Sequence, residues 1–214
     1  MTNILSLPLL SVTFETADNE DWRDSVAFAA AGSVTGYATT GNTGNGGLFN
    51  LSIAQGAYIG DYVLTTTGPG TYRVSDPDGY TIGAGVMGVP FSASGLSFTL
   101  AAGSTAFDTD DTFTLTVLPA PLDITGIRFV LQMRRAAGVP TVVLSGDTTT
   151  NTLVNGGASG VLGLAFPLTL LSQIPANAVG QPYAVDIVAI ADGVQRRCVT
   201  GTNNLVKGIT FPAA

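Results

Sequence analysis

The sequence predicts an all-β protein: a β-sandwich host domain with a second small β domain inserted in a hairpin loop. Apolar and polar residues alternate in many short runs along the 214 residues, and a period of two is that of a half-buried strand. Gly, Pro, Asn and Asp separate these runs at the short intervals expected of a sandwich.

Two segments, residues 22–28 and 127–134, are the predicted arms of the hairpin. Each has an apolar face and a polar face, as an antiparallel strand with one solvated side does. The residues expected to face the core are Trp22, Val26 and Phe28 in the first segment, and Ile127, Phe129, Leu131 and Met133 in the second. We therefore expect the second domain to be inserted between these two arms.

The insert is predicted to span residues 34–118, and the host domain to consist of residues 1–33 and 119–214. The insert contains about six strand-length runs, which is enough for a core of its own. Residues 118–121, LPAP, leave it as a stiff proline-containing exit typical of a domain boundary. Exposed loops tolerate such insertions because a longer loop adds little closure entropy.

The rest of the host domain is expected to form short strands in residues 141–166 and 182–201. Turns are predicted at Gly146-Asp147, at residues 155–157 and at Asp192-Gly193. Residues 167–175, which run from one proline to another, favour a helical turn.

The composition indicates what kind of partner the chain has. Only 11% of the residues are charged, and 8 basic residues give a net charge of -7, which argues against nucleic acid as a partner. The low charge and the mean hydropathy of +0.39 predict apolar surface that is covered by other chains, in a homo-oligomer such as a trimer. No apolar run is long enough for membrane insertion.

The residues that carry most enzyme chemistry are missing. The chain has no histidine and a single cysteine, Cys198, which removes Ser-His-Asp and Cys-His sites and the commonest zinc ligand. We expect no catalytic residue and no cofactor, and we expect Cys198 to be a structural thiol. The first residues lack the basic start of a signal peptide, so secretion by that route is not expected.

Two acidic segments are candidates for chemistry. Asp76 and Asp78, in SDPDG, are spaced as in part of a calcium loop, but the same residues form a strong turn, which is the expected structure. Asp108, Asp110 and Asp111 mark a hairpin tip, with a glycosidase carboxylate pair as the alternative.

Two further segments have a structural and a functional interpretation. Five acidic residues surround Trp22, and they are expected to form a solvated loop beside a core tryptophan, with a partner-binding patch as the alternative. These residues are Glu15, Asp18, Glu20, Asp21 and Asp24. Residues 41–47, GNTGNGG, have no following Lys or helix pattern, so we expect a flexible linker and not a phosphate-binding loop.

An apolar arm precedes the first strand of the host domain. Pro8 prevents a regular central strand in this arm. The arm is expected either to pack on its own sandwich or to dock on a neighbouring subunit. The candidate docking residues are Ile4, Leu5, Leu7, Leu9 and Leu10.

Several segments resemble known virion proteins. In the host domain these are FETADNEDWRDSVAF, LDITGIRFVLQMRR, LVNGGASGVLGLAFPLTLLSQIPA and YAVDIVAIADGVQRR. They resemble a small β-sandwich domain of tailed-bacteriophage virion proteins and are similar to the amino-terminal domain of phage upper baseplate proteins. In that pattern the first strand runs almost directly into DLTG, whereas here the insert separates the two. The insert, with GDYVLT, YRVSDPDG, LSFTLAAGSTAF and DTFTLTV, resembles a module of phage head-decoration proteins.

The resemblance implies a non-enzymatic virion structural protein that is assembled in the host cytoplasm and whose partners are other virion proteins. The sandwich and the arm would attach it at a tail tip, baseplate or fibre anchor, and the insert would project. Capsid decoration, as a head fibre or cement protein, is the alternative. A second alternative is a carbohydrate-binding module for a host-surface glycan, in which Tyr37, Tyr58 and Tyr80 stack on sugar rings.

Overall fold

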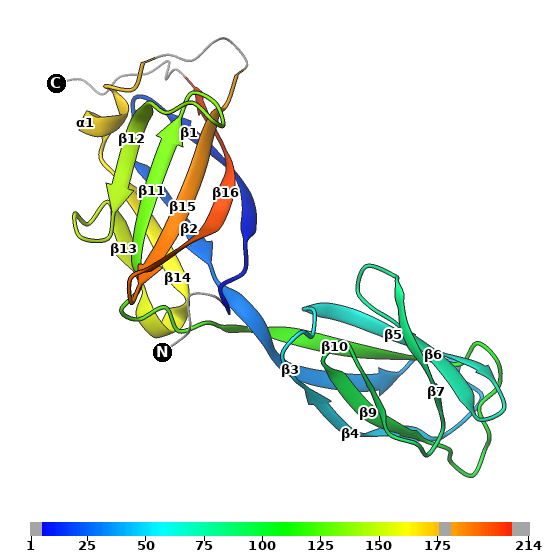
Figure 1. Cartoon of the computed structure of the whole chain (residues 1–214). Coiled ribbons are helices and arrows are strands. Elements are labelled where there is room, and N and C mark those ends of the chain that lie inside the picture. Colours follow the sequence, from blue (N-terminus) through cyan, green and yellow to red (C-terminus); the bar gives the residue numbers. More distant parts are fainter. Residues whose placement is uncertain (1–5, 176–180, 207–214) are drawn as a thin grey trace. The chain divides into compact units, whose positions relative to one another are not determined.

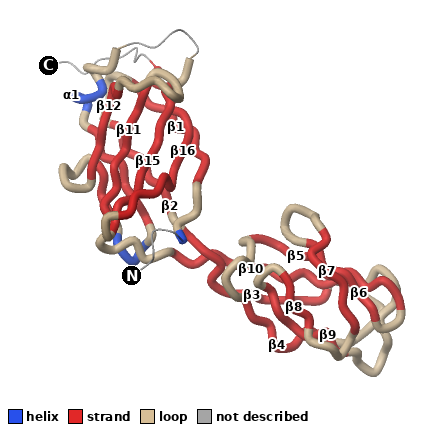
Figure 2. The backbone as a smooth tube through the Cα atoms, in the orientation of Figure 1, coloured by secondary structure: helices blue, strands red, loops and turns tan. Residues whose placement is uncertain are grey.

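A computed structural model describes residues 6–175 and 181–206 of the chain. These residues form β-strands almost throughout, as Figure 2 shows, and the all-β prediction is confirmed. Among them, α1 (Leu168–Leu171) is the one α-helix, and it lies where the sequence predicts a helical turn.

The chain divides into two compact units (Figure 1). Unit 1 consists of residues 1–28 and 121–214, and unit 2 consists of residues 29–120. Unit 2 extends beyond the predicted bounds of 34 and 118 because β3 (Ala29–Ala38), which enters it, is hydrogen-bonded to β10 (Thr112–Pro121), which leaves it. The contact of these two strands reaches Gly32 and Ala120, where a Cβ on Gly32 would lie 2.3 Å from that of Ala120.

Unit 1 is a sandwich of two sheets around one core. Its five-stranded sheet has the order β1 (Leu10–Ala17), β16 (Val194–Val206), β15 (Tyr183–Ala191), β11 (Arg128–Arg134) and β12 (Val142–Asp147). Its three-stranded sheet has the order β13 (Leu153–Asn155), β14 (Val161–Phe166) and β2 (Trp22–Ala27). β1 and β16 are parallel, and the other paired strands of unit 1 are antiparallel.

The hairpin expected from residues 22–28 and 127–134 is not formed. β2 pairs with β14, whereas β11 lies between β12 and β15 in the other sheet. The two segments instead meet across the core, where the rings of Phe28 and Phe129 stack at 5.7 Å. Alternation predicts which face of a strand is buried but not which strand lies beside it. The insert therefore leaves one sheet of unit 1 and returns to the other.

Trp22 is the centre of an aromatic cluster in the core of unit 1. Its side chain is 2% exposed, and its ring lies 5.2 Å from those of Phe14 and Phe166. The expected core role of Trp22 is therefore confirmed. Asp21, next to it, accepts a hydrogen bond from the N–H of Leu168 at 2.8 Å and so ties the β1–β2 connection to the start of α1.

The described part of the apolar arm packs mainly on its own unit. Leu7 is fully buried in the core of unit 1, and Leu10 begins β1 and contacts the same core. The docking role expected for Leu7 is therefore wrong, because that residue has no surface to offer a partner. Leu9 is 53% exposed, and its docking role stays a prediction. Ile4 and Leu5 lie outside the described residues.

Unit 2 is a second sandwich with the same numbers of strands. Its five-stranded sheet has the order β3, β10, β5 (Gly60–Gly68), β6 (Thr71–Ser75) and β7 (Thr81–Val86). Its three-stranded sheet has the order β4 (Gly47–Ile53), β9 (Leu96–Ala101) and β8 (Phe91–Ala93). Tyr72 from the first sheet packs on Phe91 and Phe98 from the second. Each unit thus has a separate core.

Residues 41–47 are not the flexible linker that their composition suggests. Asn42 exchanges two hydrogen bonds with the backbone of Thr112, at 2.7 and 2.9 Å, and the Oδ1 of Asn45 accepts the N–H of Thr105 at 2.8 Å. Gly44 is needed for close packing, because a Cβ there would lie 2.2 Å from the ring of Phe107. The segment is therefore an ordered loop.

The carboxylate of Asp111 fixes this loop from the other side. It accepts the N–H of Thr43 at 2.8 Å, that of Gly44 at 3.0 Å and that of Asp108 at 2.9 Å. Burial acts to raise the pKa of Asp111, but the three N–H donors outweigh it and hold the pKa below the ordinary value of 3.8. Asp111 therefore has a structural role that explains its place in FDTDDTF.

We predict that Asp111→Asn destabilises unit 2 by about 1 to 3 kcal/mol, because an amide has one acceptor oxygen for the three part-buried N–H groups that the carboxylate accepts. The amides of Thr43 and Gly44 should then exchange faster with deuterium than in the wild type. The ionised carboxylate of Asp111 provides this stabilisation. The difference in the free energy of unfolding between the wild type and the variant should therefore be complete above pH 3.8, and it should decrease as the pH drops through the lowered pKa of Asp111.

Asp110→Asn is the matched control for this experiment. Asp110 has a left-handed backbone with φ of 70°, which Asn tolerates, and its side chain is exposed. Equal acceleration of exchange in both variants would contradict the role of Asp111.

Candidate interaction surface

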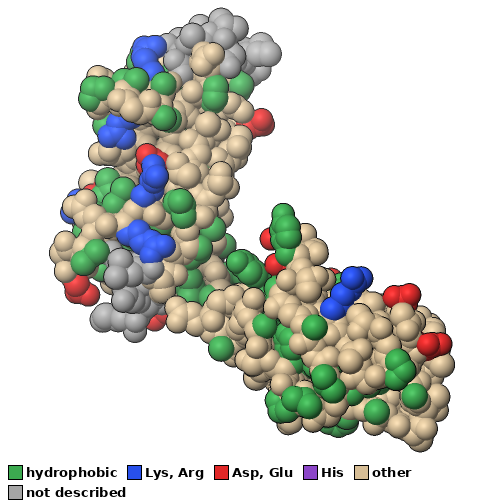
Figure 3. Space-filling model, turned by 45° about the vertical axis from the view of Figure 1, so that its right-hand side comes forward, with side chains coloured by type: hydrophobic (Ala, Val, Ile, Leu, Met, Phe, Trp, Pro, Cys, Tyr) green, Lys and Arg blue, Asp and Glu red, His purple; other side chains and the backbone are tan. Residues whose placement is uncertain are grey.

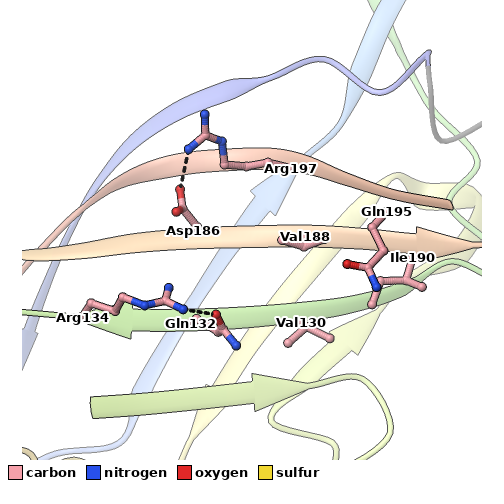
Figure 4. Close-up of a pocket in the computed structure, with 8 residues that line it drawn as sticks. All are labelled: Val130, Gln132, Arg134, Asp186, Val188, Ile190, Gln195 and Arg197. Atoms are coloured by element: carbon pink, nitrogen blue, oxygen red, sulfur yellow. Dashed lines mark hydrogen bonds and ion pairs between the residues drawn. The ribbon is translucent and has the colours of Figure 1, made fainter. Parts of the chain in front are cut away.

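The outer side of the five-stranded sheet in unit 1 carries a shallow hollow of about 210 Å³. We call this surface the sheet face and define it by the eight residues that line the hollow. They are Val130, Gln132, Arg134, Asp186, Val188, Ile190, Gln195 and Arg197. All come from β11, β15 and β16, and Figure 4 shows them on these three adjacent strands.

Strand pairing places these side chains next to one another. Val130 lies opposite Val188, and Gln132 lies opposite Asp186. Residues of β11 and β15 that point outward alternate with buried ones such as Phe129 and Leu131. The face is therefore the solvent side of the same strands whose other side forms the core.

A β-bulge at Cys198 completes the sheet face. Ile187 pairs with Val199, whereas the next residue, Val188, pairs with Arg197, so Cys198 is the extra residue. Without it, Arg197 would lie opposite Ala189, which is buried, and its charge would point into the core. The bulge shifts the alternation by one residue and brings Arg197 to the outer side.

The sheet face has a polar end and an apolar part. Figure 4 shows Arg134, Gln132, Asp186 and Arg197 at one end, and Val130, Val188 and Ile190 toward the other. Arg197 and Asp186 form an ion pair at 3.6 Å, long enough to leave hydrogen-bonding capacity on both groups. Apolar residues beside arginine and amide groups are a composition that protein interfaces share.

Arg134 is a charge of this face that has no carboxylate partner among the described residues. Its guanidinium donates to Oε1 of Gln132, and no ion pair joins it to a carboxylate among residues 6–175 and 181–206. A guanidinium has five N–H donors in a planar fork that suits a carboxylate. By contrast, Arg128 on the same strand is bound by Asp147, whose pKa it lowers. Arg134 therefore has donors available to a partner.

Cys198 itself is buried in the core of unit 1. The thiol donates to the carbonyl oxygen of Ile187 at 3.4 Å, and burial raises its pKa to about 11. The predicted structural role of this thiol is confirmed.

The calcium candidate consists of residues that form a turn. Asp76 is buried, and its Oδ1 accepts the N–H of Asp78 at 3.1 Å and that of Tyr80 at 2.8 Å. The backbone of Asp76 also receives the N–H of Gly79. The expected turn is confirmed, and within the described part of the chain no group of three or more acidic, His or Cys residues is placed to hold a metal ion.

The tyrosines expected to stack on sugars are exposed. Tyr37 lies on β3, Tyr58 lies on the loop before β5, and Tyr80 ends the turn that Asp76 fixes. The end of that loop lies close to the turn, since a Cβ on Gly60, the first residue of β5, would lie 2.9 Å from Pro77. Tyr58 and Tyr80 therefore project from adjoining loops, with 57% and 73% of their surface exposed.

Sequence patterns did not indicate the sheet face as a site. The alternation in residues 127–134 marks Arg128, Gln132 and Arg134 as outward residues of a strand, which is a weak signal. The bulge at Cys198 places Arg197 on the outer side, and no sequence pattern predicts this bulge. In the described residues no helix is long and apolar enough to cross a membrane.

Comparisons with known proteins give only partial likenesses. No protein-family model and no curated protein matches the chain. A crystal structure of FlgL from Xanthomonas campestris is 25% identical over 45% of this chain and 32% of that chain, with a TM-score of 0.34. The flagellar hook junction protein FlgK from Burkholderia pseudomallei is 13% identical over 81% of this chain and 38% of that chain, also with a TM-score of 0.34. This chain thus covers well under half of either structure. Such scores do not assign it to the flagellar proteins, and neither structure is a phage protein.

We predict that the thiol of Cys198 does not react with a disulfide reagent at pH 8 while unit 1 is folded. Burial excludes the reagent, and a pKa of about 11 keeps the thiolate fraction very small. Absorbance should show release of one equivalent of reporter in urea and almost none in buffer. Rapid labelling of the native chain would contradict the bulge geometry.

Proposed function

We propose that the chain is a non-enzymatic structural subunit of a phage virion, which attaches through unit 1 and displays unit 2. The observation that carries this proposal is the presence of two separate sandwich cores, of which unit 1 bears the sheet face. An attachment module and a displayed module each need a core of their own if one is to be held while the other is presented.

The sequence resemblance supports the same division. The four segments similar to the amino-terminal domain of upper baseplate proteins all lie within unit 1. The four segments that resemble a head-decoration module all lie within unit 2. We propose a tail-tip, baseplate or fibre-anchoring place because unit 1 carries both the resemblance to upper baseplate proteins and the sheet face. Capsid decoration is the alternative that the insert favours.

We predict that the chain is a component of purified phage particles from cells that encode it. Immunogold labelling with an antibody raised against the full chain should give label confined to the tail end. Dense label over the head would replace the tail placement with capsid decoration, because decoration requires many more copies. Absence of the chain from purified particles by mass spectrometry would overturn the virion role.

A second candidate function, glycan binding, is favoured by Tyr58 and Tyr80. Both are held by the backbone, since the N–H of Tyr58 donates to the hydroxyl of Tyr62 at 2.7 Å and that of Tyr80 donates to Asp76. Exposed aromatic rings on fixed loops can stack on the apolar face of a hexose at low entropic cost. A host-surface polysaccharide is the ligand that such a pair would suit.

We predict that the full chain binds oligomers of glucose or N-acetylglucosamine, and that Tyr80→Ala weakens the binding about tenfold. Isothermal titration calorimetry measures this directly. Phe49→Ala is the matched control, because Phe49 is 56% exposed but lies on β4 in the three-stranded sheet. No binding, or an equal loss in the control, would remove this candidate.

A further inference from the structure

We propose that the sheet face of one copy binds the acidic β1–β2 segment, residues 15–24, of a second copy of this chain. This inference rests on the proposed structural role of the protein, to which it adds a partner and a surface. The steps that lead to it are the unpaired donors of the face, the unpaired acceptors of the segment and the rigidity of both.

The first step is the excess of donors on the sheet face. Arg134 lacks a carboxylate partner among the described residues, and Arg197 makes only the long contact to Asp186. Figure 3 shows arginine side chains spread over one side of unit 1. Beside these charges, Val188 and Ile190 offer a half-buried apolar surface. A ligand for this face must therefore supply carboxylates together with some apolar contact.

The second step is the matching set of acceptors on the β1–β2 segment. Glu15 and Glu20 are exposed, and the carboxylate of neither forms a hydrogen bond or an ion pair in the part of the chain that the structure describes. Asp21 is already engaged by Arg23 and by the N–H of Leu168. The two glutamates thus lie on a segment that Asp21 helps to hold in place.

The third step is that the segment is preorganised. Phe14 and Trp22, on either side of the turn, pack against each other in the core. The N–H of Asp18 donates to the carbonyl oxygen of Val206 at 3.1 Å. Because the backbone is fixed by these contacts, presenting the glutamates to a partner costs little conformational entropy.

The carboxylates of unit 2 are a weaker match for the sheet face. Asp76 and Asp111 are buried and accept backbone N–H groups. Asp108 accepts the N–H of Thr109, and Asp61 accepts the hydroxyl of Thr116. Asp78 and Asp110 are exposed and their carboxylates have no partner among the described residues, but they lie on separate turns, whereas Glu15 and Glu20 belong to one segment.

The proposed contact joins two copies, because the two patches do not meet within one. Glu15 lies on β1, at the edge of the same sheet, and no ion pair joins it to Arg134 or Arg197 within the described chain. Donor and acceptor surfaces are thus different patches of one unit. Contact between such patches is heterologous, so each copy can give and receive one contact, as in a ring.

Charge reversal on each side tests the inference in the full chain. The face variant is Arg134→Glu with Arg197→Glu, and the segment variant is Glu15→Arg with Glu20→Arg. Sedimentation velocity over a concentration series should show that the wild type self-associates, and more weakly at about 0.5 M salt than at about 0.05 M. Each variant alone should associate at least about tenfold more weakly.

Mixing the two variants is the decisive measurement. The face variant then carries acidic groups on both patches and the segment variant carries basic groups on both, so only the mixture offers complementary pairs. Association should return in the mixture to within a few-fold of the wild type. Arg73→Glu and Asp78→Arg, the same charge changes on unit 2, are the controls and should have no effect. Fluorescence of Trp22 reports whether unit 1 stays folded in each variant.

The outcomes separate the inference from the proposed function. A wild type that associates while the mixture does not would overturn the contact proposed here. A wild type that stays monomeric at every concentration would overturn it as well. In either case the labelling of virions decides the structural role independently, because a subunit can be held by other virion proteins through a different surface.

Discussion

The phase of side-chain alternation along β16 is the constraint on which the sheet face depends. In a strand, each residue is either inside or outside, and one extra residue exchanges the two sets for the rest of the strand. Cys198 is that residue, and two consecutive residues, Cys198 and Val199, are buried as a result. A small apolar side chain suits this position because the bulge turns it into the core. The charge of Arg197 is thereby kept in water beside Val188.

A second constraint acts where the chain passes between its two units. β3 and β10 carry the chain into and out of unit 2, and they pair with each other up to the boundary. The ends of the insert are therefore adjacent in its folded form. The three backbone N–H groups held by Asp111 act at another point of the same unit, where the loop after β3 meets the residues before β10.

The fold class, most strands and the existence of an insert could be predicted from local patterns. Alternation identifies the buried side of a strand such as 127–134 because burial acts on each residue separately. It does not identify partners, and so the hairpin between residues 22–28 and 127–134 was a wrong prediction. Asp192-Gly193 forms the turn between β15 and β16 as predicted, whereas Gly146 and Asp147 still belong to β12.

The sheet face, the order of residues 41–47 and the burial of Leu7 were not predicted from the sequence, because each depends on tertiary contacts. Residues 41–47 are ordered by Asp111 and Phe107, which are far away in the sequence, so their glycines suggest a freedom that the fold removes. Likewise, Leu7 was expected in an arm because Pro8 interrupts regular strand structure, yet its side chain is buried in the core of unit 1. Effects of this kind depend on tertiary contacts, which no local pattern contains.

The parallel pairing of β1 with β16 affects the order in which the chain can fold during synthesis. Leu10 lies beside Val199, so β1 must wait for β16, which leaves the ribosome much later. All strands of unit 2 lie between these two in the sequence and can pair as soon as they emerge, since contacts between near residues form first. The five-stranded sheet of unit 1 is complete only after β16 has been made. A nascent chain that lacks β16 therefore has no complete sheet face.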